Sequence, residues 1–142
     1  MTTLAADSHR TYELNRALDK TNDLPVIASD IIYEGAAVGD NGSGLARPLV
    51  AGDPFMGFAL KQCDNSAGAA SAKNVNLQES GGIVLDVTGV SSAADVGEAV
   101  YATDDNVFTL TASGASAIGK VMRWISSTKC VVKFESVAMR SI

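Results

Sequence analysis

Beyond residue 25 the chain consists of short apolar runs that are broken by turn residues. Turn signals occur at Asp40-Asn41-Gly42, Gly52-Asp53-Pro54, Gly81-Gly82 and Asp104-Asp105-Asn106. Short runs between such turns are typical of the strands of a closed barrel or a sandwich. This feature predicts an all-β fold of short, mostly antiparallel strands over residues 26–142, arranged as a small barrel or sandwich.

The spacing of apolar residues within these runs indicates strands. The clearest run covers residues 129–135 and predicts one buried face and one face in water. The buried face is expected to carry Cys130, Val132 and Phe134, and the wet face Lys129, Val131, Lys133 and Glu135. Alternation at residues 83–87 and 107–111, and the β-branched run 26–33, predict further strands. After residue 25 only residues 91–95 favour a helical conformation, of a single turn.

The stretch VGDNGSGL, residues 38–45, raises the question of a phosphate-binding loop. Such a loop needs a following helix and a lysine in the pattern GxxxxGK[ST]. Both are missing, since Pro48 would interrupt the helix and the residue directly after Gly44 is Leu45 rather than a lysine. Asn41-Gly42 instead suits the tight turn of a β-hairpin, whose central residues need positive φ. The stretch therefore predicts a hairpin.

Composition and charge exclude several classes of protein. The chain of 142 residues is 46% hydrophobic and 19% charged, which is typical of one folded domain. Its net charge of −5 argues against nucleic-acid binding, because that affinity depends on Lys and Arg. No run has the length of a membrane helix, and the N-terminus lacks the apolar core of a secretion signal. We therefore expect no nucleic acid, no membrane and synthesis in a cytoplasm.

Residues able to support catalysis or bind a metal are few. His9 is the only histidine, and Cys63 and Cys130 are the only cysteines, which is too few for a structural zinc site. We expect both cysteines to be reduced, with Cys130 buried. Asp104-Asp105-Asn106 lacks the spacing of a calcium loop and is better explained as a turn. The sequence therefore predicts no catalytic residue, no metal site and no cofactor.

Residues 1–25 differ from the rest of the chain. They are rich in charge and carry a weak helical pattern in which Tyr12, Leu14 and Leu18 share part of one face. This composition suits an N-terminal arm, extended or with one short helix, that ends at Pro25. The three apolar side chains could enter grooves on a partner, or the arm could pack on its own barrel or on a neighbouring copy. The sequence leaves these options open.

Basic residues gather toward the C-terminal end, in a chain that is acidic as a whole. Against the single acid Glu135, this part contains Lys120, Arg123, Lys129, Lys133 and Arg140. Solvated strand faces explain Lys129 and Lys133, and the alternative is a patch that meets an acidic partner. Trp124 lies beside Arg123, and both residue types are enriched at interfaces. Arg123 and Trp124 are thus candidates for partner binding, although Trp124 equally suits the core.

A weak internal similarity relates residues 49–60 to residues 111–122. Two glycines match, Gly52 with Gly114 and Gly57 with Gly119, and a turn rich in Asp and Asn precedes each segment. If the similarity is structural, it predicts two similar hairpins that form opposite walls of one barrel.

The order of these segments resembles one known family. The stretches DIIYEGAAVGDNGSGLARPLVAGDPFMGFAL, GGIVLDVTGV, ADVGEAVYATDDNVFTLTASGASAIGKVMRW and KCVVKFES resemble the capsid cement, or head decoration, proteins of tailed phages. The resemblance covers about residues 26–136 and rests on strand starts of the form G-x-A and IG-x-V. These motifs are structural glycines and turns, without a catalytic signature. The N-terminal arm lies outside the resemblance.

The resemblance implies a structural virion protein without enzymatic activity. Members of the family are small β-rich proteins on the outside of the icosahedral head, where they brace the expanded shell. The implied partners are the major capsid protein and neighbouring copies of the chain, since such proteins often form trimers. Two other functions remain open, a carbohydrate- or protein-binding β module of a tail or fibre, and a hydrolase that uses a pair of carboxylates.

Overall fold

The computed structural model describes residues 3–12 and 21–140, and its fold is all-β, as predicted. The described part of the first half contains seven strands, β1 (Thr21–Pro25), β2 (Asp30–Ile32), β3 (Ala37–Asp40), β4 (Ala46–Pro48), β5 (Phe55–Ala59), β6 (Cys63–Asn65) and β7 (Asn74–Gln78). The second half contains β8 (Ser80–Thr88), a 3-10 turn η2 (Ala93–Asp95), β9 (Ala99–Ala102), β10 (Phe108–Thr109), β11 (Ser116–Ser126) and β12 (Lys129–Glu135).

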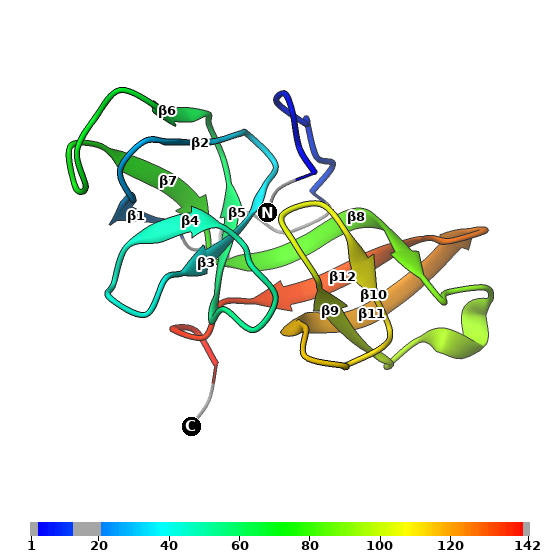
Figure 1. Ribbon diagram of the computed structural model, residues 1–142. Coiled ribbons are helices and arrows are strands. Elements are labelled where there is room, and N and C mark those ends of the chain that lie inside the picture. Colours follow the sequence, from blue (N-terminus) through cyan, green and yellow to red (C-terminus); the bar gives the residue numbers. More distant parts are fainter. Residues whose placement is uncertain (1–2, 13–20, 141–142) are drawn as a thin grey trace.

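The strands form two main sheets, which lie side by side in Figure 1. The first sheet has the order β1-β7-β5-β3-β4, and β2 pairs with β6 beside it. The second is a closed five-stranded barrel with the order β10-β8-β12-β11-β9, from which the β11–β12 hairpin extends away from the first sheet. The predicted barrel of mostly antiparallel strands is confirmed, although it contains only the second half of the chain.

Most of the predicted strands occur, with differences in burial and in extent, and the strand predicted over residues 107–111 is limited to the two residues of β10. β12 begins at Lys129 and ends at Glu135, as predicted, but Val131 is fully buried instead of exposed. Val131 lies between its register partners Arg123 on β11 and Val84 on β8, so this strand is flanked on both sides. The continuous strand predicted over residues 26–33 is wrong, because a turn with Ser29 at a φ of +60° separates β1 from β2. β1 also lies within the segment that the sequence assigned to the arm.

The short elements follow from local side-chain bonding. The single helical turn predicted at residues 91–95 is confirmed as η2, where Ser92 and Asp95 cap each other's backbone N–H groups. The hairpin predicted at residues 38–45 is also confirmed, since β3 pairs with β4. Its loop is longer than a two-residue turn, and Gly42 and Gly44 rather than Asn41 adopt positive φ.

The two halves share one topology. In the first sheet the strand order is β4-β3-β5-β7-β1. When the strands of the two halves are matched in chain order, β1 corresponds to β8, β3 to β9, β4 to β10, β5 to β11 and β7 to β12. The barrel then has the same order, β10-β9-β11-β12-β8. Each residue of β9 lies 62 positions after the matching residue of β3, because β3 begins at residue 37 and β9 at residue 99. A parallel contact also joins β10 to β8 in the barrel, and a single parallel bridge joins Val26, next to β1, to Ala46 in β4. The first sheet is therefore a nearly closed version of the barrel.

The strand register repeats with the same spacing. Val38 lies opposite Gly57 in the first sheet, and Val100 lies opposite Gly119 in the barrel. Each pairing is followed by a β-bulge, after which Gly39 lies opposite Phe55 and Tyr101 opposite Ala117. The similarity seen in the sequence is thus structural. The prediction that the two segments form opposite walls of one barrel is wrong, because β5 and β11 belong to different sheets.

Two hydrophobic cores fill the halves. The first core lies within the first sheet and includes Val38, Val75 and Leu77. The second core fills the barrel and also takes in Phe55 and Phe58, which project from β5 of the first sheet. Both rings are almost fully buried, and Phe58 packs edge-on against Phe134 with ring centroids 4.9 Å apart. β5 therefore joins the two halves, since its outer face closes the barrel.

Candidate functional site

Residues 3–12 lie against both halves, so this part of the predicted arm packs on its own chain (Figure 1). Ser8 donates its backbone N–H to the carbonyl of Glu34 at 2.7 Å, and Val84 donates to the carbonyl of Thr11 at 2.9 Å. Tyr12 forms an antiparallel bridge with Ile83 of β8. The segment thereby covers a part of the β8 edge that β10 does not reach.

Arg10 and Asp105 anchor this segment. Arg10 donates hydrogen bonds to the carbonyl of Gly35 and to Oδ1 of Asn106, both at 2.9 Å, and its guanidinium lies over the ring of Phe108. Asp105 is fully buried, and its Oδ1 accepts the backbone N–H of Thr3 at 2.9 Å. Burial raises the pKa of the Asp105 carboxyl and lowers that of Arg10. The turn predicted at Asp104 is confirmed, but the burial of its second residue is not evident from the sequence.

The residues predicted to bind a partner do not form one cluster. Tyr12 and Trp124 are half-buried and pack against the barrel core, and the Trp124 indole donates to the carbonyl of Ser127 at 2.9 Å. Arg123 is exposed on β11. Leu14 and Leu18 lie outside the described residues. Tyr12 and Trp124 thus have structural contacts that account for their positions.

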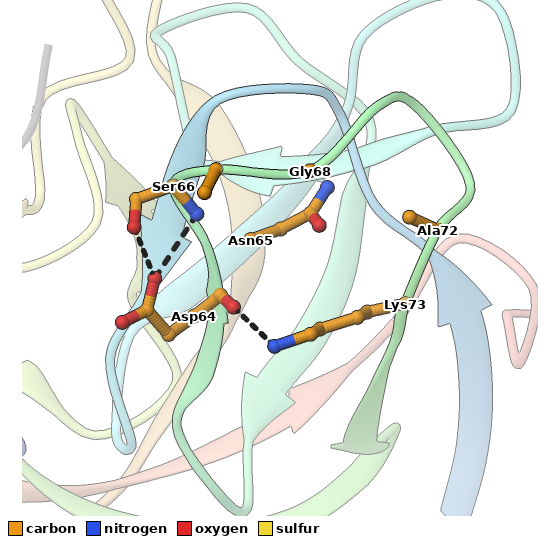
Figure 2. Close-up of a pocket in the computed structure, with 7 residues that line it drawn as sticks. Asp64, Asn65, Ser66, Gly68, Ala72 and Lys73 are labelled. Carbon is orange, nitrogen blue, oxygen red and sulfur yellow. Dashed lines mark hydrogen bonds between the residues drawn. The ribbon is translucent and has the colours of Figure 1, made fainter.

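A pocket of about 430 Å³ opens beside β6 (Figure 2). Asp64 lies at its rim, where its Oδ1 accepts bonds from the N–H and hydroxyl of Ser66, and Lys73 donates to the carbonyl of Asp64 at 2.7 Å. The Asn65 amide donates to the carbonyls of Ile27 and Ala69, and its buried Oδ1 has no partner among the described residues. These contacts brace the loop between β6 and β7, which has no counterpart in the short β11–β12 turn.

A groove of about 320 Å³ lies on the outer face of the barrel where β9, β11 and β12 meet. Ala99 and Ala117 give it an apolar floor, and Lys120, Lys133, Glu135 and Arg140 surround it. Arg140 is held over the groove by hydrogen bonds to the carbonyls of Glu135 and Ala117. The groove therefore combines apolar contact area with an excess of positive charge.

The strand register extends this charge along the hairpin. Lys133 lies directly opposite Lys120, and Lys129 and Arg123 follow on the same outer side of β12 and β11. We call Lys120, Arg123, Lys129 and Lys133 the basic face. Asp86, opposite Lys129, and Glu135 are the acids nearest to it in the register. The sequence indicated the excess of basic residues, but not that they share one face.

His9 and the two cysteines have ordinary environments for structural residues. His9 is exposed, with Nδ1 2.7 Å from the carboxylate of Glu34. Cys63 and Cys130 are free, as predicted, and both are buried, as predicted for Cys130. Burial raises the pKa of Cys63, and it raises that of Cys130 to about 11. In the described residues no group of three or more His, Cys, Asp or Glu side chains could hold a metal ion.

We expect neither thiol to react with DTNB in the folded protein at mildly alkaline pH. The thiolate is the reactive form, and the raised pKa of Cys130 keeps that group protonated until the pH approaches about 11. Both thiols should react in denaturant. A stopped-flow absorbance trace measures this, and rapid reaction of one thiol in the folded protein would contradict the buried positions.

Comparison with known proteins found no matching protein-family model and no matching curated protein. Within residues 3–12 and 21–140, no helix is both long and apolar enough to cross a membrane.

Proposed function

We propose that the chain is a structural protein of a phage virion, which binds the outer surface of the expanded capsid and stabilises it by bridging coat subunits. Its partners would be the major capsid protein and neighbouring copies of itself. The proposal needs neither a cofactor nor an enzymatic activity. Binding to several coat subunits at once would raise the total affinity far above that of a single contact.

The observation that carries the proposal is the agreement between the resemblance and the fold. The segments that resemble cement proteins are the strands and turns of two filled β structures. Large apolar side chains are exposed at the surface instead, notably Val96, Met122 and Ile125 around η2 and the β11–β12 hairpin. A protein that acts by binding other proteins needs apolar side chains on its surface, and it does not need a cavity inside its core.

The second candidate is a carbohydrate- or protein-binding module of a tail or fibre. The pocket beside β6 favours it, because Asp64, Ser66 and Lys73 offer both donors and acceptors for hydroxyl groups (Figure 2). Its lining contains no aromatic ring, however, and aromatic side chains supply much of the contact area at binding surfaces.

Sedimentation with phage heads distinguishes these functions. We expect the purified protein to pellet with expanded heads and to stay in solution with unexpanded heads, because a surface present only after expansion would be bound only then. Equal binding to both forms would remove the preference for the expanded state. Lack of binding to either form would contradict the capsid function.

The part of the arm beyond the described segment gives a second prediction. We expect the double change Leu14→Ala and Leu18→Ala to weaken binding to expanded heads, if these apolar side chains enter grooves on the coat protein. The change leaves the contacts of residues 3–12 in place, unlike a deletion of the arm. Unchanged occupancy in the sedimentation assay would show that the arm does not dock through these two residues.

A further inference from the structure

The two halves share one topology, but the equivalent outer face is buried in the first half and exposed in the second. In the first sheet, the outer side of β3 and β5 is buried against the barrel, through Ala37, Phe55 and Phe58. The residues 62 positions later are Ala99, Ala117 and Lys120. Ala117 and Lys120 are exposed, and all three line the groove on the barrel. The face that packs in the first half is thus open in the second.

The side chains on the open face are not those of a second aromatic contact. Lys120 stands where the first half has Phe58, and Ala117 stands where it has Phe55. These changes remove the large rings, leave a groove with an apolar floor and add a cation at its edge. The occupant of this face must therefore differ from the barrel core that receives the two rings.

The placement of charge on the basic face works against the stability of the hairpin. Lys120 and Lys133 are directly opposite in the register, and like charges in that position repel. The side-chain ammonium groups of Lys120, Lys129 and Lys133 form no ion pair or hydrogen bond with any residue in the described ranges. Lys120 and Lys133 line the groove, and Lys129 lies farther along β12. Ammonium groups with unused donors at these positions are suited to carboxylates supplied from outside.

We propose that the groove and the basic face together form a docking surface for an acidic segment of another protein, with apolar side chains over Ala99 and Ala117 and carboxylates against Lys120, Lys129 and Lys133. The inference rests on the proposed function only in naming the coat protein as the source of that segment. Charge complementarity identifies the partner's chemistry, and the occupied face of the first half shows that this side of the fold can pack against protein.

A nucleic acid is a poorer match for the same surface. The whole chain has a net charge of −5, so a long polyanion would be repelled by the remaining surface. The one tryptophan in the hairpin is half-buried against the core, with its indole N–H bonded to Ser127, and is not presented for base stacking.

A labelled acidic peptide tests the surface without a capsid. Fluorescence anisotropy would follow a fluorescein-labelled hexaglutamate peptide, which should bind at low salt and dissociate as salt is raised. The double variant Lys120→Gln/Lys133→Gln should bind about fivefold more weakly. The matched control Lys61→Glu makes the same change in net charge at an exposed residue of the first half and should bind like the wild type.

The outcomes separate the surface from the function. Equal loss in Lys120→Gln/Lys133→Gln and in Lys61→Glu, or no loss in either, would overturn the docking surface. Tighter binding of a short DNA duplex than of the peptide would overturn an acidic protein segment as the partner. If the peptide results hold but expanded heads are not bound, the capsid function fails and the surface stands. If heads are bound equally by wild type and Lys120→Gln/Lys133→Gln, the surface is overturned and the function stands.

Thermal stability distinguishes a binding role of Lys120 and Lys133 from a structural role in the hairpin. Neutralising two opposed lysines should leave the Tm of the Lys120→Gln/Lys133→Gln variant equal to or above that of the wild type, because it removes a repulsion. Weaker peptide binding together with an undiminished Tm supports the docking surface. A clear fall in Tm would show that the two lysines stabilise the hairpin itself, and would overturn the inference.

Discussion

Replacing Phe58 with Ala is expected to lower the free energy of unfolding by about 3–5 kcal/mol. The ring is fully buried and packs against three others, with centroids 4.9 Å from Phe134, 5.5 Å from Phe55 and 6.0 Å from Phe108. Its removal leaves a cavity where the first sheet closes the barrel, and the backbone of β5 cannot collapse into that space without breaking its pairing with β3 and β7. Chemical denaturation followed by fluorescence measures the loss.

Ile125→Ala is the control for Phe58→Ala. Ile125 is a large apolar residue of the β11–β12 hairpin with 39% of its surface exposed, so its truncation should cost no more than about 0.5 kcal/mol. A loss at Phe58 that is as small as the loss at Ile125 would mean that β5 does not pack into the barrel core.

Alanine at Gly57 or Gly119 is expected to cost about 3 kcal/mol or more at each site. A methyl group at Gly57 would overlap the carbonyl oxygen of Gln78, and one at Gly119 would overlap that of Lys133. Gly57 also has a φ of +130°, which side chains rarely adopt. The two glycines occupy equivalent bulges, so the variants should fail for the same reason. Thermal melting of both proteins measures the effect.

Gly42→Ala separates crowding from backbone preference. Gly42 has a φ of +96°, but a methyl group there would meet nothing within 4 Å. This change should cost about 1 kcal/mol, from the left-handed conformation alone. If Gly57→Ala and Gly119→Ala cost no more than Gly42→Ala, the close approach of the neighbouring strands would be contradicted.

The sequence predicted a strand correctly where buried and exposed side chains alternate along that strand. The prediction failed where burial depends on pairing with strands that are distant in the sequence. The limits of β12 were predictable because burial of every second residue is a property of one strand. The burial of Val131 was not predictable from that alternation, since Val131 lies in a strand that is paired on both sides, with β8 and with β11. The turn between β1 and β2 was also missed, because Ser29 gives no clear signal of its positive φ.

The candidate surface was predictable only in part, for a related reason. Alternation placed Lys129 and Lys133 on one side of a strand. Lys120 and Arg123 join them through the register of β11, which shifts at a bulge between Val121 and Arg123. No residue pattern in the sequence marks that bulge. The repeat itself was visible as two matching glycines, but only the strand order shows that it relates the two halves.

The insertion of Phe55 and Phe58 into the barrel makes each half incomplete without the other. A fragment ending after β7 would present both rings to water, and a fragment starting at β8 would leave its interior unsealed. The chain should consequently melt in a single cooperative step, as one thermodynamic unit despite its doubled construction. A force that pulls on the β11–β12 hairpin would then act on the first sheet as well, because the two halves cannot separate without exposing Phe55 and Phe58.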